Sequence, residues 1–211
     1  MGTQRIAPSV SISPDARVGN PAELMPQRLA VYSWQTPFDD LFPIIGEDTV
    51  VEAFCTIDSG TYQPTRIGAR AYLMKGVHVG HDTVIEDGCV IAPHAAFGGS
   101  VWMGSHVRVG MGATFRPFIS VGHHSTVGQG AAVVTDIPPY ECWGGVPARR
   151  LFALCFVCGK RAEDKVPARW VGVEPETPPA PWLERRHAPM LARHNLFRSY
   201  CFAHRNHEGG P

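Results

Sequence analysis

Large hydrophobic residues recur at every sixth position through the middle of the chain. The uninterrupted series is Ile67, Leu73, Val79, Ile85, Ile91, Phe97, Met103, Val109, Phe115, Val121, Val127 and Val133. Small or β-branched residues follow four places after most of its members, as at Ala71, Thr83 and Cys89. The buried face of an α-helix repeats every 3.6 residues and that of a strand every two. A period of six therefore excludes a single long helix or a single long strand.

The period of six predicts very short strands separated by tight turns. Three such units make one coil of 18 residues, in which the large residue and the small residue four places later both point inward. Each coil bonds to the next, so like residues stack in the core. Glycine follows the large residue at Gly68, Gly80, Gly98, Gly104, Gly110, Gly122 and Gly128. We expect these glycines to relieve backbone strain in the turns of an all-β, parallel β-helix.

The repeat also covers the N-terminal part of the chain, with two interruptions. It is present at Ile6, Ile12, Val18 and Leu24, and again at Ile45, Val51 and Ile57. It slips by four residues at "TYQPT", residues 61–65. Residues 25–44 break it altogether and are predicted to form a loop insertion, and loops of that length are often functional. Trp34, Gln35, Asp39 and Asp40 make this loop a candidate substrate clamp.

Composition narrows the class of protein. The formal net charge is zero, so the whole-domain basic field typical of nucleic-acid binding is missing. No apolar run reaches the roughly 18 residues of a membrane span, and the first residues lack the apolar core of a signal peptide. We therefore expect a cytoplasmic protein without a membrane span. High counts of glycine (22) and proline (19) agree with a turn-rich β protein.

Candidate chemistry lies in "HVGHDTVIED", residues 78–87. In the predicted register Val79 points inward, whereas His81 and Asp82 lie on the turn and His78 faces outward. Gly99 follows His81 by one coil, so an imidazole would stand beside a backbone without a side chain. Acyl transfer needs an imidazole that acts as base, next to an amide N–H that donates a hydrogen bond to the developing oxyanion. The alternative is an exposed turn histidine, which is what we expect at His94, His106, His123 and His124.

The segment from "VVEAFCTIDSGT" to "VTDIPPY" resembles the hexapeptide-repeat acyltransferases over roughly residues 45–140. The similarity is closest to the UDP-N-acetylglucosamine acyltransferases of lipid A synthesis and to the sugar N-acetyltransferases, and its most specific part is H-x-x-H-D with Gly-Gly one coil later. The resemblance implies a left-handed β-helix over residues 1–140 and a homotrimer with sites between subunits. It implies His81 as general base, Asp82 as the residue that orients it, and Gly99 as oxyanion donor. It further implies His78 at the edge of the substrate, and a sugar or nucleotide-sugar as acceptor.

Three positions depart from the lipid A enzymes. Asp58, Ser100 and Arg116 stand where those enzymes carry histidine. We predict that these three side chains bind substrate. Because they differ chemically from imidazole, the resemblance does not fix UDP-N-acetylglucosamine as the acceptor.

The acyl donor is suggested by "YECWGGVPARRL", residues 140–151. This stretch resembles the G-N-P-A-[KR] ending of the coenzyme-A-dependent hexapeptide acetyltransferases, with Val146 in place of asparagine. Residues 141–150 are thus predicted to form the chain exit and to contact acyl-CoA through Gly145, Pro147 and Arg149, with Arg149 and Arg150 available for phosphates. Acyl-CoA is favoured over acyl-carrier protein. A plain chain exit would also use glycine and proline.

The last segment, residues 151–211, has lost the repeat. Cys155-x-x-Cys158 and Cys201-x-x-His204 form two ligand pairs suited to tetrahedral Zn²⁺, although His207 can replace His204. Cysteines in a reducing compartment favour thiols or metal over disulfides. A proline-rich extension buries little apolar surface, so a structural zinc would supply stability. The alternatives are that the extension binds a partner such as a carrier protein, or that it caps the end of the coil.

Two further interpretations are kept. A γ-carbonic-anhydrase-like metalloprotein has the same coil, but it needs two histidines five residues apart, and no pair here has that spacing. The other is a non-catalytic β-helix scaffold that docks through its zinc-binding extension.

Overall fold

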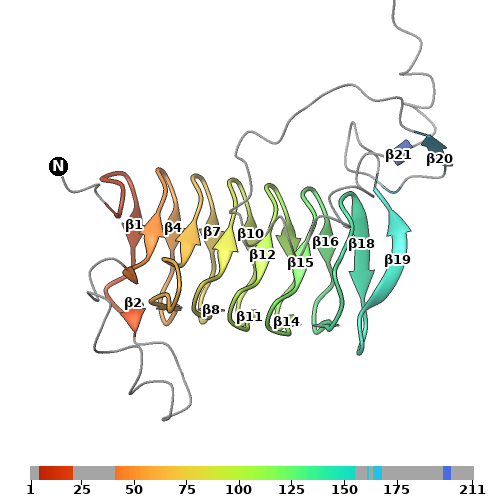
Figure 1. Ribbon diagram of the computed structural model, residues 1–211. Helices are drawn as coiled ribbons and strands as arrows, with labels where there is room; N and C mark the ends of the chain where they lie inside the picture. Colours follow the sequence, from red (N-terminus) through yellow and green to blue (C-terminus); the bar gives the residue numbers. More distant parts are fainter. Residues whose placement is uncertain (1–4, 21–40, 155–160, 162–163, 168–196, 201–211) are drawn as a thin grey trace, which may run out of the picture.

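Short parallel strands coil around one axis in the computed structural model, which describes residues 5–20, 41–154, 161, 164–167 and 197–200 (Figure 1). The first sheet contains β1 (Ser11–Ile12), β4 (Val50–Val51), β7 (Tyr72–Leu73), β10 (Val90–Ile91), β13 (Arg108–Val109), β16 (Thr126–Val127), β18 (Glu141–Gly144) and β19 (Arg149–Ala153). The second contains β2 (Arg17–Asn20), β5 (Thr56–Asp58), β8 (His78–Val79), β11 (Ala96–Phe97), β14 (Thr114–Phe115) and β17 (Ala132–Val133). The third contains β3 (Ile44–Ile45), β6 (Arg66–Ile67), β9 (Val84–Ile85), β12 (Trp102–Met103) and β15 (Ser120–Val121).

The register confirms the coil of 18 residues. Val90 pairs with Arg108, and Ala96 pairs with Thr114 on the next coil of the neighbouring sheet. All twelve members of the uninterrupted hydrophobic series are at most 4% exposed. Like residues stack as predicted, and the rings of Phe97 and Phe115 lie parallel with centroids 4.6 Å apart. The all-β, parallel solenoid is therefore confirmed, while its left hand stays a prediction.

The reason given for the repeated glycine was wrong. The left-handed backbone conformation falls two residues further on, at residues such as Asp82 (φ 59°) and Gly88 (φ 66°). The glycine directly after the large residue is instead a point of close approach between coils. A Cβ on Gly80 would lie 2.8 Å from the Phe97 carbonyl oxygen, closer than real Cβ contacts. Glycine is required there by the spacing of the coils and not by its freedom in φ.

Gly110→Ala tests this explanation. A Cβ at Gly110 would lie 2.7 Å from the Gly128 carbonyl carbon and closer still to the Gln129 amide. We expect the free energy of unfolding to fall by about 1–3 kcal/mol, as in other overpacked sites. Gly128→Ala is the matched control, because a Cβ there would meet its nearest atom, the Trp143 carbonyl oxygen, at an ordinary 3.4 Å. Urea unfolding of both variants measures the difference, and equal stabilities would contradict close approach as the cause.

Both interruptions of the repeat lie between strands. Thr56 pairs with His78, 22 positions later, so the "TYQPT" stretch adds four residues to its coil. Ser11 pairs with Val50, 39 positions later, which accommodates the loop insertion predicted at 25–44. Of that insertion, residues 41–44 are described, and Trp34, Gln35, Asp39 and Asp40 lie outside the described residues.

The C-terminal end of the coil differs from a simple chain exit. β18 continues the first sheet beside β16, and β19 folds back on β18 in an antiparallel hairpin. β20 (Asp164–Pro167) and β21 (Phe197–Tyr200) form a separate antiparallel pair within the extension. The predicted zinc ligands Cys155, Cys158, Cys201 and His204 lie outside the described residues. No helix in the described part of the chain is long and apolar enough to cross a membrane.

Candidate active site

The corner after β8 brings His81 and Asp82 together. The His81 Nδ1 atom lies 2.7 Å from the Asp82 Oδ2 atom. The imidazole side chain is 23% exposed, whereas the carboxylate is only 3% exposed. Asp82 occupies the left-handed position of the turn, with φ 59°, a conformation that aspartate tolerates better than most residues. A buried acid thus stands behind an accessible imidazole.

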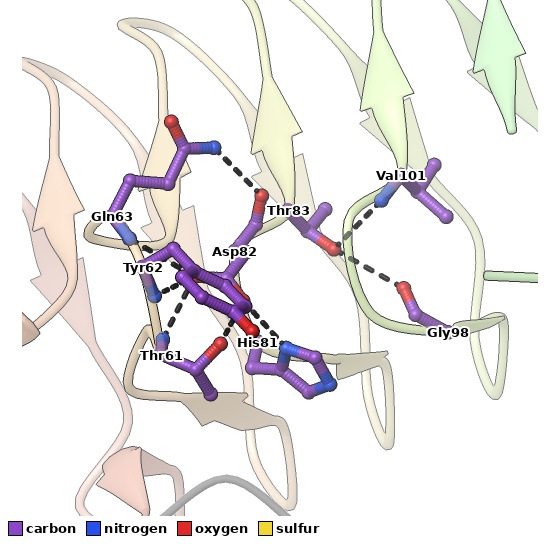
Figure 2. A network of polar contacts seen from close by, with 8 residues as sticks. All are labelled: Thr61, Tyr62, Gln63, His81, Asp82, Thr83, Gly98 and Val101. Atoms are coloured by element: carbon purple, nitrogen blue, oxygen red, sulfur yellow. Dashed lines mark hydrogen bonds and ion pairs between the residues drawn. The ribbon is translucent and has the colours of Figure 1, made fainter. Parts of the chain in front are cut away.

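Asp82 is held in its ionised form by the four-residue insertion of the preceding coil (Figure 2). Its Oδ1 atom accepts the backbone N–H groups of Thr61, Tyr62 and Gln63 at 2.7, 2.9 and 3.1 Å. Its Oδ2 atom accepts the Thr61 hydroxyl at 2.5 Å as well as the His81 ring. Burial opposes ionisation, but the hydrogen bonds from His81, Thr61 and Tyr62 outweigh it and lower the pKa of Asp82 to about 2.

An ionised Asp82 determines the tautomer of His81. A carboxylate only accepts hydrogen bonds, so the Nδ1 atom of the neutral ring must carry the hydrogen. The Nε2 atom then keeps its lone pair. It faces Gly99, since a Cβ on Gly99 would lie 2.5 Å from His81 Cε1 and closer still to Nε2. The side-chain-free residue predicted beside the imidazole is therefore in place, and the ring is oriented to accept a proton there.

The amide of Gly99 differs from the equivalent amides at two other corners. The N–H groups of Lys75 and Ser105, at the same position of their turns, donate to Glu52 at 3.1 Å and to Glu86 at 3.0 Å, carboxylates one coil earlier. The residue equivalent to these glutamates at Gly99 is Gly80, which has no side chain. Among the described residues none accepts a hydrogen bond from the Gly99 N–H. The Gly99 N–H is thus a candidate donor beside the His81 ring.

A strip of small residues runs past the imidazole. The register places Asp58, Gly80, Gly98 and Arg116 on successive coils, each directly after a core residue. Asp58 is 5% exposed and Arg116 is exposed. The two predicted substrate residues therefore lie at opposite ends of a strip whose middle residues are glycines, Gly80 packed against the backbone of the next coil and Gly98 against the Pro117 ring.

The other predicted substrate residues also adjoin this corner. His78 lies on β8, three residues before His81, and its Nδ1 atom is 2.8 Å from the Thr56 hydroxyl. Ser100 follows Gly99 and is 7% exposed, and its N–H donates to the His81 carbonyl at 2.8 Å. His78 and Ser100 thus flank the His81–Gly99 contact.

The predicted coenzyme A segment forms the turn of the β18–β19 hairpin. Gly145 (φ 92°) accepts a hydrogen bond from Ala132 at 3.0 Å, so the turn continues the second sheet beyond β17. Pro147 lies in this turn, and Arg149 begins β19 as an exposed residue. The Arg150 guanidinium lies 2.9 Å from the Glu141 carboxylate, whereas the Arg149 guanidinium donates to the Ala148 carbonyl at 3.0 Å and has no acidic partner within the described residues.

The remaining histidines of the repeat lie away from His81. His106, His124 and Tyr140 stack along the corners after the third sheet, with centroids 4.9 and 5.1 Å apart, and His123 meets Tyr140 edge-on. Burial, with His106 nearby, lowers the pKa of His124, which favours its neutral form. Within the described residues no group of three or more His, Cys, Asp or Glu is arranged to hold a metal ion.

Sequence reasoning missed the residues that hold Asp82. Thr61, Tyr62 and Gln63 belong to "TYQPT", where the slip in the repeat was visible but had no assigned role. Asn20, which precedes the loop insertion, and Leu41, near its C-terminal end, both contact this segment. Ser59 donates to the Asn20 carbonyl at 2.7 Å and Gly60 donates to the Leu41 carbonyl at 2.9 Å. The slip was the available signal, because an extra turn in so regular a coil needs a local reason.

The fold and this corner define a class of protein: a hexapeptide-repeat β-solenoid with an acid–imidazole–amide site. Residues 64–99 match the family model described as bacterial transferase hexapeptide (six repeats). The resemblance to hexapeptide-repeat acyltransferases is therefore confirmed.

Particular relatives are the acyl-[acyl-carrier-protein]–UDP-N-acetylglucosamine O-acyltransferases. The protein from Thiobacillus denitrificans is 36% identical over 107 residues, 49% of this chain and 42% of the relative. That from Campylobacter concisus is 35% identical over 100 residues, 46% and 38% of the two chains. The crystal structure of UDP-N-acetylglucosamine O-acyltransferase (LpxA) from Moraxella catarrhalis superposes with a TM-score of 0.64 at 27% identity, over 70% of this chain and 55% of that one. The chain thus spans less than half the length of these two curated relatives.

Proposed function

We propose that this protein transfers an acyl group from a thioester to an amine or hydroxyl of a sugar or nucleotide-sugar. The observation that carries the proposal is the contact of His81, oriented by ionised Asp82, with Gly99, whose amide has no acceptor within the described residues. The names of the relatives agree with acyl transfer to a nucleotide-sugar.

The reaction is a substitution at the thioester carbonyl. His81 Nε2 removes the proton of the acceptor amine or hydroxyl while that atom bonds to the carbonyl carbon. The negative charge that develops on the carbonyl oxygen is stabilised by the Gly99 N–H. The tetrahedral intermediate then breaks the carbon–sulfur bond, and the imidazolium returns its proton to the departing thiolate. Asp82 keeps its charge throughout and stabilises the imidazolium.

The acceptor would lie along the strip from Asp58 to Arg116, with His78 and Ser100 at its sides. A carboxylate at one end and a guanidinium at the other suit an acceptor with hydroxyl or amine groups and an anionic portion, as in a nucleotide-sugar. The curated relatives act on UDP-N-acetylglucosamine by name. The three departures from histidine in this chain favour a different sugar.

The donor we favour is acyl-CoA, with Gly145, Pro147 and Arg149 as its contacts. These residues lie at the end of the second sheet, the sheet that carries His78. Four strand spacings of about 4.8 Å separate this turn from β8, roughly 19 Å in total. A long, extended donor along the sheet could bridge that distance. Acyl-carrier protein, the donor in the relatives' names, is the competing choice.

The proposed protein is a cytoplasmic homotrimer with a zinc-binding C-terminal extension. We place Tyr62 and Phe118, which are 66% and 49% exposed on the coils either side of the site, at an interface between subunits of a homotrimer. A structural Zn²⁺ on Cys155, Cys158, Cys201 and His204 would stabilise the extension. A cytoplasmic location fits a soluble thioester donor.

Thiol release tests the function. The full chain is incubated with acyl-CoA or acyl-carrier protein of several acyl lengths and a panel of amino sugars, hydroxy sugars and their nucleotide forms. We expect release above the acceptor-free rate for at least one pair, with the acylated sugar identified by mass. No release with any pair, alongside stable binding of a partner protein, would support the non-catalytic scaffold instead.

A further inference from the structure

We propose that the segment Ser59–Gln63, at the four-residue slip of the repeat, is a cradle for the Asp82 carboxylate, and that Thr61 is the positioning residue that directs the Asp82 Oδ2 atom toward His81. The inference deepens the proposed function and rests on it. The cradle is defined as residues Ser59–Gln63. Its N–H groups and the Thr61 hydroxyl donate to the Asp82 carboxylate, so we place their effect on chemistry at Asp82.

The cradle divides the two oxygens of Asp82 between two tasks. Three consecutive N–H groups, from Thr61, Tyr62 and Gln63, converge on Oδ1 and fix that atom. The Thr61 hydroxyl donates to Asp82 Oδ2 at 2.5 Å. The same Oδ2 atom also accepts a hydrogen bond from His81 Nδ1 at 2.7 Å. The Gln63 side chain also donates to the Asp82 backbone carbonyl at 3.0 Å. Both the carboxylate and its main chain are thereby held to the preceding coil.

The cradle is itself rigidly connected. Ser59 donates to the carbonyl of Asn20, which precedes the loop insertion, and Gly60 donates to the carbonyl of Leu41, near its C-terminal end. A Cβ on Gly60 would lie 2.6 Å from the Gln63 carbonyl carbon and closer still to its oxygen, so only glycine permits a turn this tight. Thr61 is 7% exposed and Asp82 is 2% exposed. Buried hydrogen bonds to a charged group are strong and directional, so the cradle has the stiffness that a positioning role needs.

The repeat shows why the insertion is needed for this purpose. At the corner after β9, Asp87 has a smaller set of partners: the Ala69 N–H at 2.9 Å and an exposed pair with Arg70. The extra four residues convert an ordinary corner acid into one with five hydrogen-bond donors, including His81.

Thr61→Val and Thr61→Ser separate positioning from packing. Valine keeps the shape and the three N–H donors but removes the hydroxyl, whereas serine restores it. We expect Thr61→Val to lower kcat for thiol release by about 10-fold with little change in KM, and Thr61→Ser to recover most of the loss. Titration of the Asp82 carboxyl by ¹³C NMR is expected to move from its low pKa of about 2 toward the ordinary value in the valine variant only.

Thr49→Val is the matched control, because Thr49 is also a buried corner threonine, whose hydroxyl donates to the Gly68 carbonyl at 2.7 Å. It should leave kcat and the Asp82 titration unchanged. An unaltered Asp82 titration in Thr61→Val, or equal loss of kcat in both valine variants, overturns the inference. If the wild-type chain transfers no acyl group, the proposed function fails, but the NMR titration still decides whether Thr61 holds Asp82.

Discussion

His81→Ala is expected to lower the rate of thiol release by about 10²–10⁴-fold, the usual contribution of a general base. The variant loses the imidazole that contacts the Asp82 carboxylate on one side and lies against Gly99 on the other. Because the Gly99 amide and the substrate strip remain, acceptor binding should change little and the loss should fall on kcat. Steady-state kinetics with the best donor and acceptor from the panel measure this directly.

His123→Ala is the control for removing an imidazole from another turn of the same β-solenoid. His123 packs against Tyr140 and His124 at the corners after the third sheet and takes no part in the site. Its activity should match the wild type. Retention of full activity in His81→Ala, or an equal loss in both variants, would remove His81 from the mechanism.

Gly99→Ala is expected to cost about 10²–10³-fold in kcat, similar to the loss of an oxyanion-hole donor. The new methyl group would lie 2.5 Å from His81 Cε1 and closer still to Nε2, so the ring must turn away from Asp82 or from the substrate. A turned ring would also change the space beside the Gly99 N–H. The substitution therefore damages the base and the oxyanion donor together.

Gly128→Ala again supplies the comparison, because its Cβ would make only ordinary contacts. It should retain wild-type kinetics and stability. The crystal structure of Gly99→Ala is expected to show a rotated His81 ring with a lengthened contact to Asp82. A variant with an unmoved ring and full activity would show that the space beside Gly99 is not used in the reaction.

The interruption at "TYQPT" shows where a repeat is most informative. In the sequence it is a slip of four residues between Ile57 and Ile67, with nothing to indicate what the added residues contact. In the structure they wrap the Asp82 carboxylate of the next coil. Contacts of this kind join residues about 20 positions apart, and their direction depends on the backbone path through the turn. A break in the repeat shows that the backbone path changes, but it does not show which residues the added segment contacts.

The role of Gly80 illustrates the same limit. Its place after a core residue was visible as part of a series of glycines, and all were given one explanation based on φ. The structure separates them. Gly80 permits close approach to the next coil and, by lacking a carboxylate, leaves the Gly99 amide without the partner that Glu52 and Glu86 give to other corners. That distinction depends on which side chain the neighbouring coil presents.

The coil, its repeat of 18 residues, its core and the proximity of His81 to Gly99 could all be predicted from the amino-acid sequence alone. These follow from the period, since in-register stacking brings position i next to i+18 regardless of detail. The three-dimensional structure was needed to show what keeps Asp82 ionised and oriented toward His81 and that the Gly99 amide has no acceptor among the described residues. It was also needed to show that β18 and β19 form a hairpin at the end of the first sheet. Those properties depend on hydrogen-bond directions and burial, which arise when turns from different coils meet and which no periodicity encodes.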